Sequence, residues 1–279
     1  MIKKAKRIIG RIIRILQRKD MLVLPGQLAF FLLLGIVPTV TLTACLSSLF
    51  NISMININYI ISNLFNEQVA SMLTPIITEF RLSFENVLIL IVALYVSSNS
   101  ASSIIVTSNE LYGIKTTSFL HRKTKAIVMI ILLLLVVVFG MLVPVFSNKL
   151  IDLVNLIRFN SVLDRIVDVI VTILKLSRGP ISWIIMYFII KLTYTMAPDG
   201  KVSSKSITKG SLFTTFGLII STYIYSLFIN HQASVNVVYG GLANFVVLMI
   251  WLYIISYIII IGIAINAEDA QKELKNNKD

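Results

Sequence analysis

The longest uncharged stretch of the chain, residues 210–267, most constrains what it can fold into, because it contains no Asp, Glu, Lys or Arg. At ~1.5 Å of rise per residue, a helix of this length can cross a hydrocarbon core of roughly 30 Å twice. Polar residues interrupt the apolar run near its middle, at Asn230, His231, Gln232 and Asn236. The stretch therefore predicts a helical hairpin in a lipid bilayer.

The composition supports a membrane protein. Of the 279 residues, 57% are hydrophobic, which is well above the apolar share of ordinary soluble domains. Charge-free windows longer than about 18 residues recur along the chain, which favours a single bundle of membrane spans. We expect an all-α fold, a polytopic transmembrane bundle of six helical spans.

The predicted bundle occupies residues 21–267. Its spans lie at about 22–50, 86–109, 126–146, 179–197, 210–230 and 239–267. A basic amphipathic interfacial helix at 1–20 is expected before the bundle and a charged cytoplasmic tail at 268–279 after it. Apolar residues recur at helical spacing in 51–85 and 147–178, which predicts two amphipathic helices on the outer face. Pro38 should kink the first span, because proline cannot donate a backbone hydrogen bond.

The basic residues predict the orientation of the chain. The formal net charge is +12, but the basic residues lie in short segments between apolar runs, which favours membrane loops over nucleic-acid binding. Eighteen Lys and Arg fall in the segments on the side of the termini and six in the outer segments. The positive-inside rule therefore predicts that both termini are cytoplasmic.

The second half of the second span is unusually polar. Hydroxyls and amides surround most of this helix, and an unpaired polar group in lipid costs several kcal/mol. This half must therefore face protein or water. Small polar residues at helix contacts account for the pattern, and so does the lining of a substrate cavity. The candidate cavity-lining residues are Ser97, Asn99, Ser100, Ser103 and Thr107.

Several motifs along the chain resemble those of the YihY family, also called virulence factor BrkB. They are Gln27–Phe31 followed by Pro38, Asn109–Gly113, Tyr194–Pro198, Lys209–Gly210, Tyr239–Leu242, Trp251–Tyr253, and Gly262 with Asn266–Glu268. The resemblance covers nearly the whole chain and rests on the order and spacing of these motifs together. The family usually has arginine where this chain has Thr195, so no role of that arginine is carried over.

The resemblance implies a six-span protein of the bacterial cytoplasmic membrane, from a family once mislabelled as ribonuclease BN. Family membership implies no settled biochemical activity, and proposals for the family centre on transport or flipping of lipid-like molecules. Candidate gating or coupling residues are Asn109, Glu110, Tyr194, Tyr239, Gly240, Asn266 and Glu268. Carboxylates at span ends, such as Glu110 and Glu268, are also explained by solvation, and Tyr239–Gly241 by close helix packing.

Catalytic and cofactor chemistry find little support in the sequence. A two-metal hydrolase needs clustered His, Asp or Glu ligands, whereas this chain has only two histidines, His121 and His231, which are predicted on opposite sides of the membrane. Cys45 is the only cysteine, and no GxxxxGK[ST] motif for nucleotide binding occurs. We expect no enzyme activity, no metal and no cofactor.

Two functions remain open on this basis. The first is a transporter or flippase of a lipid-like or amphiphilic envelope molecule. The second is a membrane scaffold that holds partners of cell-envelope assembly and transports nothing. The expected partners are membrane lipids and a lipid-like substrate, without nucleic acid, and the sequence leaves open whether protomers pair.

Overall fold

The computed structural model describes residues 10, 12–49, 84–133, 151, 161–231 and 236–276. This part of the chain consists of helices and short connections and contains no strand. The elements are η1 Lys19–Leu22, α2 Leu24–Leu49, α5 Phe84–Tyr112, α7 Ser161–Met196, α8 Ser204–His231 and α9 Asn236–Asn276. Residues 119–133 are also helical. The all-α membrane fold is thus confirmed.

Four helices in the described part are long and apolar enough to cross a membrane. Their apolar ranges are Val87–Tyr112, Val167–Met196, Ser204–Phe228 and Phe245–Glu273. Helix α2 adds a further apolar range, Leu24–Ile36, within the residues whose side chains the structure describes. The predicted third span lies partly beyond residue 133 and the predicted amphipathic helix at 51–85 lies almost wholly outside the described residues. The number of six spans therefore stays a prediction.

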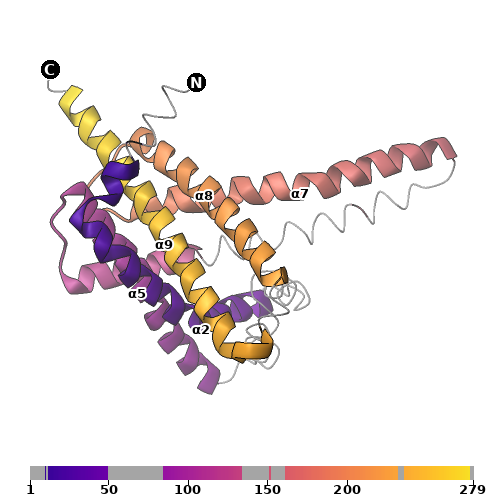
Figure 1. Cartoon of the computed structure of the whole chain (residues 1–279), viewed down its shortest axis with the longest axis horizontal. Coiled ribbons are helices and arrows are strands. Elements are labelled where there is room, and N and C mark those ends of the chain that lie inside the picture. The colour runs from indigo at the N-terminus through magenta and orange to yellow at the C-terminus, as the bar shows by residue number, and fades with distance from the viewer. Residues whose placement is uncertain are drawn as a thin grey trace.

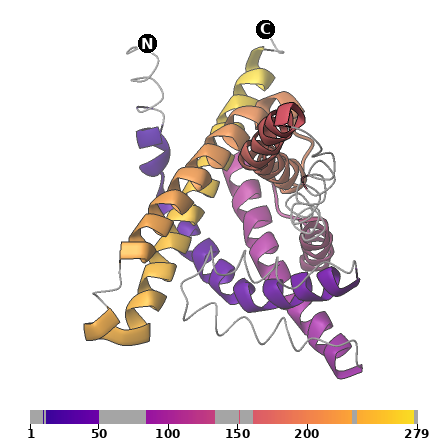
Figure 2. The same ribbon diagram turned by 90° about the vertical axis from the view of Figure 1, so that its right-hand side faces the viewer.

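The main hydrophobic core lies at one end of the bundle, which we call the packed end. Helices α5, α7 and α9 finish there, whereas α2 and α8 begin there, and each contributes fully or nearly fully buried side chains. Examples are Leu28, Ile105, Tyr194, Ile207 and Ala264. Helix α8 packs mainly on α9, and α2 packs mainly on α5. Figure 2 shows that α5 and the α8–α9 pair diverge from this end toward the opposite one.

Helix α7 differs from its prediction. We expected an amphipathic element over 147–178 and a separate span from Gly179, but Ser161–Met196 is one continuous helix with Pro180 inside it. The helical period of apolar residues continues across Gly179, and membrane helices tolerate proline better than the sequence rule assumes. The N-terminal half of α7 extends well beyond the other described helices (Figure 1).

Local capping fixes the ends of the helices at the packed end. Gly113 has a φ of 67°, and after α5 the N–H of Ile114 bonds to the carbonyl of Asn109 while that of Gly113 bonds to Glu110. This pair of bonds is a Schellman motif, which favours glycine at the left-handed position. Ser203 caps α8, because its hydroxyl accepts the N–H of Lys205 at 3.3 Å.

The described residues from 12 onward and the last described turns of α9 pack more closely on the bundle than the sequence predicts. Ile15 belongs to the predicted interfacial helix, whose apolar face was expected to contact lipid. It is instead fully buried in the main hydrophobic core. Helix α9 continues through the predicted tail as far as Asn276. Within it Asp269 is 8% exposed and pairs with Lys209 at 2.9 Å, so this part of the tail is not simply solvated.

Pro38 lies inside α2, which the structure describes as a single helix. The ribbon of α2 changes direction along its course in both views (Figure 1, Figure 2). A bend in this helix is what the proline predicts. The assignment of the bend to Pro38 itself stays a prediction, because its side chain lies outside the described set.

Candidate functional site

A polar junction ties α5 to the loop that follows α7. Asn109 is fully buried near the end of α5, and its Nδ2 donates to Asp199 Oδ2 at 2.7 Å. In return, the backbone N–H of Asp199 donates to Asn109 Oδ1 at 2.8 Å. The two residues therefore bind each other reciprocally, and Asn109 cannot be replaced without leaving buried groups unpaired.

Lys125 joins a third segment, helix 119–133, to the same junction. Its ammonium donates to the carbonyls of Ala197 at 3.0 Å and Pro198 at 2.9 Å and to Asp199 Oδ1 at 2.6 Å. Three acceptors match the three hydrogens of an ammonium group. The lysine also places positive charge beside the C-terminus of α7, where the helix dipole favours it.

Asp199 is the centre of the polar junction. Its side chain is only 2% exposed, and Thr117 adds hydrogen bonds to Oδ2 from its N–H at 3.2 Å and from its hydroxyl at 3.0 Å. Burial alone would raise the pKa of this carboxyl. The hydrogen bonds from Lys125, Asn109 and Thr117 outweigh burial and lower the pKa from 3.8 to about 2.

The depressed pKa predicts a pH dependence of stability. Because the folded-state pKa lies below the unfolded value of 3.8, ionised Asp199 stabilises the fold above about pH 4, and this contribution of about 2 kcal/mol is lost as the pH falls toward 2. The melting temperatures of wild type and Asp199→Asn, measured across this range, should therefore converge at low pH. A difference that stays constant with pH would contradict the assignment.

A close helix crossing lies beside the polar junction, where α8 meets α9. A Cβ atom at Gly210 would overlap the carbonyl oxygen of Gly262 and the side chain of Asn266. Asn266 is fully buried, and its Oδ1 accepts the backbone N–H of Gly210 at 2.7 Å. Only glycine allows the two backbones to approach this closely.

Tyr194 brings α7 into this crossing. Its side chain is 3% exposed, and its hydroxyl donates to the carbonyl of Ile259 at 2.7 Å and lies 2.7 Å from Thr214 Oγ1. The tyrosine thus links α7, α8 and α9 through one oxygen atom. The residues at the crossing and the polar junction include three of the predicted gating residues, Asn109, Tyr194 and Asn266.

The other predicted gating residues lie elsewhere. Glu110 follows Asn109 but is exposed, and Glu268 is half-buried and borders a small polar pocket. Tyr239 and Gly240 lie in the first turns of α9, and their surroundings fall outside the described set. Among the described residues, no three His, Cys, Asp or Glu side chains gather as metal ligands.

The polar half of α5 faces protein. Ser97, Ser100, Ser103 and Thr107 are each at most 8% exposed, and Asn99 is half-buried. The hydroxyl of Ser100 donates to the carbonyl of Phe31 in α2 at 2.8 Å. None of these residues lines either cavity described here. Their positions therefore agree with helix packing, and their role as a cavity lining stays untested.

Lys123 makes contacts that the sequence did not predict. We expected it in a solvated loop, but helix 119–133 packs it against α5, where it is 8% exposed. Its ammonium donates to Asn99 Oδ1 at 2.7 Å and to the carbonyl of Tyr95 at 3.0 Å, and it lies 3.7 Å from the centre of the Tyr95 ring. These contacts stabilise a buried cation without a carboxylate.

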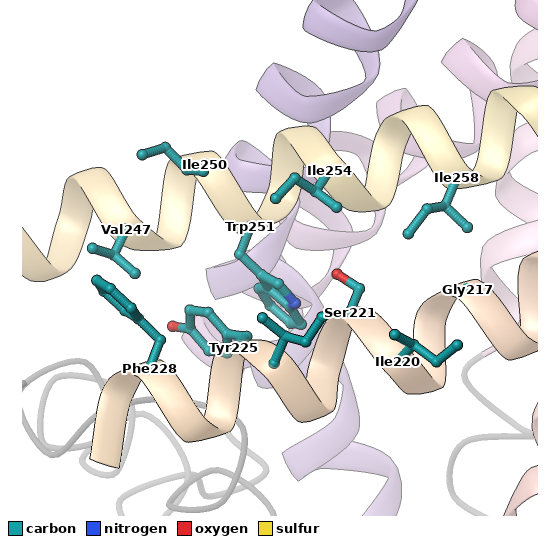
Figure 3. A pocket seen from close by; sticks show the side chains of 11 residues that line it. Gly217, Ile220, Ser221, Tyr225, Phe228, Val247, Ile250, Trp251, Ile254 and Ile258 are labelled. Carbon is teal, nitrogen blue, oxygen red and sulfur yellow. The ribbon is translucent and has the colours of Figure 1, made fainter. Parts of the chain in front are cut away.

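A groove of about 520 Å³ lies between α8 and α9, away from the packed end. In Figure 3 the side chains of Tyr225, Phe228 and Trp251 project between the two helices. The lining residues are Gly217, Ile220, Ser221, Ile224, Tyr225, Phe228, Val247, Ile250, Trp251, Ile254 and Ile258. Tyr225 stacks on Trp251 with ring centres 4.5 Å apart and planes at 17°. The groove is almost wholly apolar and suits a hydrocarbon chain.

The chain is similar in sequence to several known bacterial proteins. The ribonuclease-like protein YfkH of Bacillus subtilis is 26% identical over 247 residues, which cover 87% of each chain. UPF0761 membrane proteins of Pseudoalteromonas translucida and Psychromonas ingrahamii are each 29% identical, over 27% and 30% of this chain and 25% and 30% of theirs. No solved structure matches at a significant level.

The family comparison covers almost the whole chain. Residues 12–279 match the model of the family described as virulence factor BrkB. The UPF0761 relatives are named as membrane proteins, which agrees with the four apolar helices described above. Several of the motif residues from the sequence analysis, among them Asn109, Tyr194, Gly210 and Asn266, lie together at the packed end. This chain is therefore a membrane protein of the virulence factor BrkB family.

Proposed function

We propose that this protein binds a lipid-like or amphiphilic envelope molecule and moves it between the leaflets, as a transporter or flippase. The observation that carries the proposal is the apolar groove between α8 and α9, because it offers a continuous surface for a hydrocarbon chain. The proposal includes no enzymatic step, cofactor or metal. It places the protein in the bacterial cytoplasmic membrane with the packed end on the cytoplasmic side.

The depth of the groove supports this reading. Tyr225 lies near the end of the apolar range Ser204–Phe228, and Trp251 stacks on it. Aromatic side chains of this kind favour the membrane interface. From there the groove runs to Gly217 and Ile258, toward the middle of the bilayer. A lipid seated in it would therefore keep its headgroup at the surface and its chain against α8 and α9.

Filling the groove should stop transport. We expect Ser221→Phe to block it and to reduce the rate at which reconstituted protein flips a fluorescent phospholipid to that of protein-free liposomes. Tyr223→Phe is the matched control, because Tyr223 is 65% exposed on the same helix and does not line the groove. Wild-type rates equal to empty liposomes across a panel of envelope lipids would refute the proposal.

Occupancy of the groove can be measured separately from transport. The chain has two tryptophans, Trp183 and Trp251, so the variant Trp183→Phe leaves only the groove tryptophan. Lipids brominated along the acyl chain should then quench Trp251 fluorescence, and Ser221→Phe should reduce this quenching. Quenching without flipping would show a lipid-binding protein that does not transport.

A scaffold for envelope-assembly partners is the second candidate. The observation that favours it is the packing of the polar half of α5, because hydroxyls such as Ser100 are used for contacts between helices. A scaffold needs rigid helices and no pathway through the bundle. Cross-linked envelope-synthesis enzymes, recovered together with protein that is inactive in flipping, would support this candidate over the first.

A further inference from the structure

A small polar pocket lies at the packed end, between the N-terminal segment and the last turns of α9. Its volume is about 230 Å³, and Arg14, Glu268, Gln271 and Lys272 line it. The three α9 residues follow one another at i, i+3 and i+4, so they share one face of the helix. Two cationic groups and one carboxylate give this lining a formal net charge of +1.

The protein core holds the two walls of this pocket in place. Ile15, next to Arg14, is fully buried in the main hydrophobic core. The backbone of the same segment is tied to α9, because the hydroxyl of Tyr257 donates to the carbonyl of Met21 at 3.2 Å. The Arg14 backbone is therefore positioned by the fold, although its side chain is exposed.

The surroundings place the pocket at the membrane surface. Apolar side chains in the segment that carries Arg14 are exposed, among them Ile13 at 48% and Leu16 at 41% next to it and Leu22 at 79% farther along. Exposed apolar groups of this size beside basic residues are typical of a segment that lies in the lipid interface. Trp251 and Glu268 are also separated by about 25 Å along α9, which is close to the thickness of the hydrocarbon core. The pocket and the α8–α9 groove therefore face opposite leaflets.

We propose that this pocket binds the phosphate of an anionic phospholipid in the leaflet at the packed end. The Arg14 guanidinium offers several N–H donors in a planar fork, Lys272 adds an ammonium and Gln271 an amide, and these groups match phosphate oxygens. Glu268 limits the charge that the pocket accepts, so a phosphodiester with one negative charge fits better than a dianionic phosphate. The site does not require that the protein moves lipid.

The test compares ligands on the full chain in detergent. Short-chain phosphatidylglycerol should raise the melting temperature in a saturable way, because a ligand that binds only the folded state stabilises it. Short-chain phosphatidylcholine should bind more weakly. Inorganic phosphate is the comparison that distinguishes a lipid phosphate from a soluble anion as the ligand. If it stabilises the protein as strongly as phosphatidylglycerol and depends equally on Arg14 and Lys272, the ligand is a soluble anion and the lipid assignment is overturned.

A pair of double variants separates the pocket from general charge attraction. Arg14→Gln with Lys272→Gln should raise the apparent dissociation constant for phosphatidylglycerol at least about tenfold, because two charged hydrogen bonds are lost. Lys201→Gln with Lys205→Gln removes the same charge from exposed positions at the same end and should leave it within about twofold. Equal losses in both variants, or no stabilisation of wild type by phosphatidylglycerol, would overturn the proposal. Neither readout depends on flipping, so a failure of the transport assay leaves this test intact.

Discussion

Gly262→Ala should destabilise the protein by about 3 kcal/mol, near the upper end of the usual cost of overpacking a core. The new Cβ atom would overlap Thr214 Oγ1 and would lie 2.7 Å from Tyr194 Oη and 3.0 Å from the carbonyl oxygen of Gly210. Thr214 and Tyr194 cannot simply move aside, because hydrogen bonds hold their side-chain oxygens in place. The melting temperature of detergent-solubilised protein, or the yield of monodisperse protein, measures the loss.

Two further variants make this prediction specific. Gly26→Ala is the control, because this glycine lies in α2 and its nearest contact, Tyr253 Cε2, would be 4.0 Å from a Cβ atom; its melting temperature should stay close to wild type. Thr214→Ala combined with Gly262→Ala should cost less than the sum of the single changes, because it removes the atom that the new methyl group meets. Full stability of Gly262→Ala would show that the crossing is looser than described.

Asp199→Ala should cost about 3–5 kcal/mol, the usual effect of removing one partner from a buried ion pair. Lys125 loses its counter-ion, whose side chain is 2% exposed, while Asn109 and Thr117 lose their common acceptor. The connection 113–118 should then loosen. Faster trypsin cleavage after the exposed Lys115, together with a lower melting temperature, would report both effects.

The control for Asp199 is a carboxylate close by in the same region. Glu110 is exposed, so Glu110→Ala should change stability by no more than about 0.5 kcal/mol. The pair itself is tested by a double-mutant cycle, in which Lys125→Met and Asp199→Ala together should cost less than the sum of the two. Strict additivity would mean that the two side chains do not stabilise each other.

The sequence predicts the helical fold well where composition alone decides the outcome. The described residues of the charge-free stretch 210–267 lie in α8 and α9, which pack against each other as the predicted hairpin requires. The prediction fails at Gly179 and Pro180. We placed a helix boundary there because glycine and proline usually end helices in water-soluble proteins, but α7 continues through both residues. The start of α8 at Ser204 and the end of α9 at Asn276 were also missed, because both helices include charged residues beyond the apolar range.

The candidate site was predictable only in part. The motif residues Asn109, Tyr194 and Asn266 were identified by resemblance, and the structure brings them to the packed end. Asp199 and Lys125 were not, because each looks like an ordinary loop charge and their contact joins positions 74 residues apart. One signal was present: Asp199 is the only acidic residue between Pro198 and Lys209, directly after a helix end.

The concentration of close contacts at one end of this bundle has a mechanical consequence. The end of α5 and the α8–α9 pair are held together there by buried hydrogen bonds and a close glycine contact, while the other half of α5 diverges from that pair (Figure 2). Each helix then acts as a lever with its pivot at the joined end. A small rotation at the pivot moves the far tips by several times as much, so the distance between the far halves can change while the polar contacts stay intact.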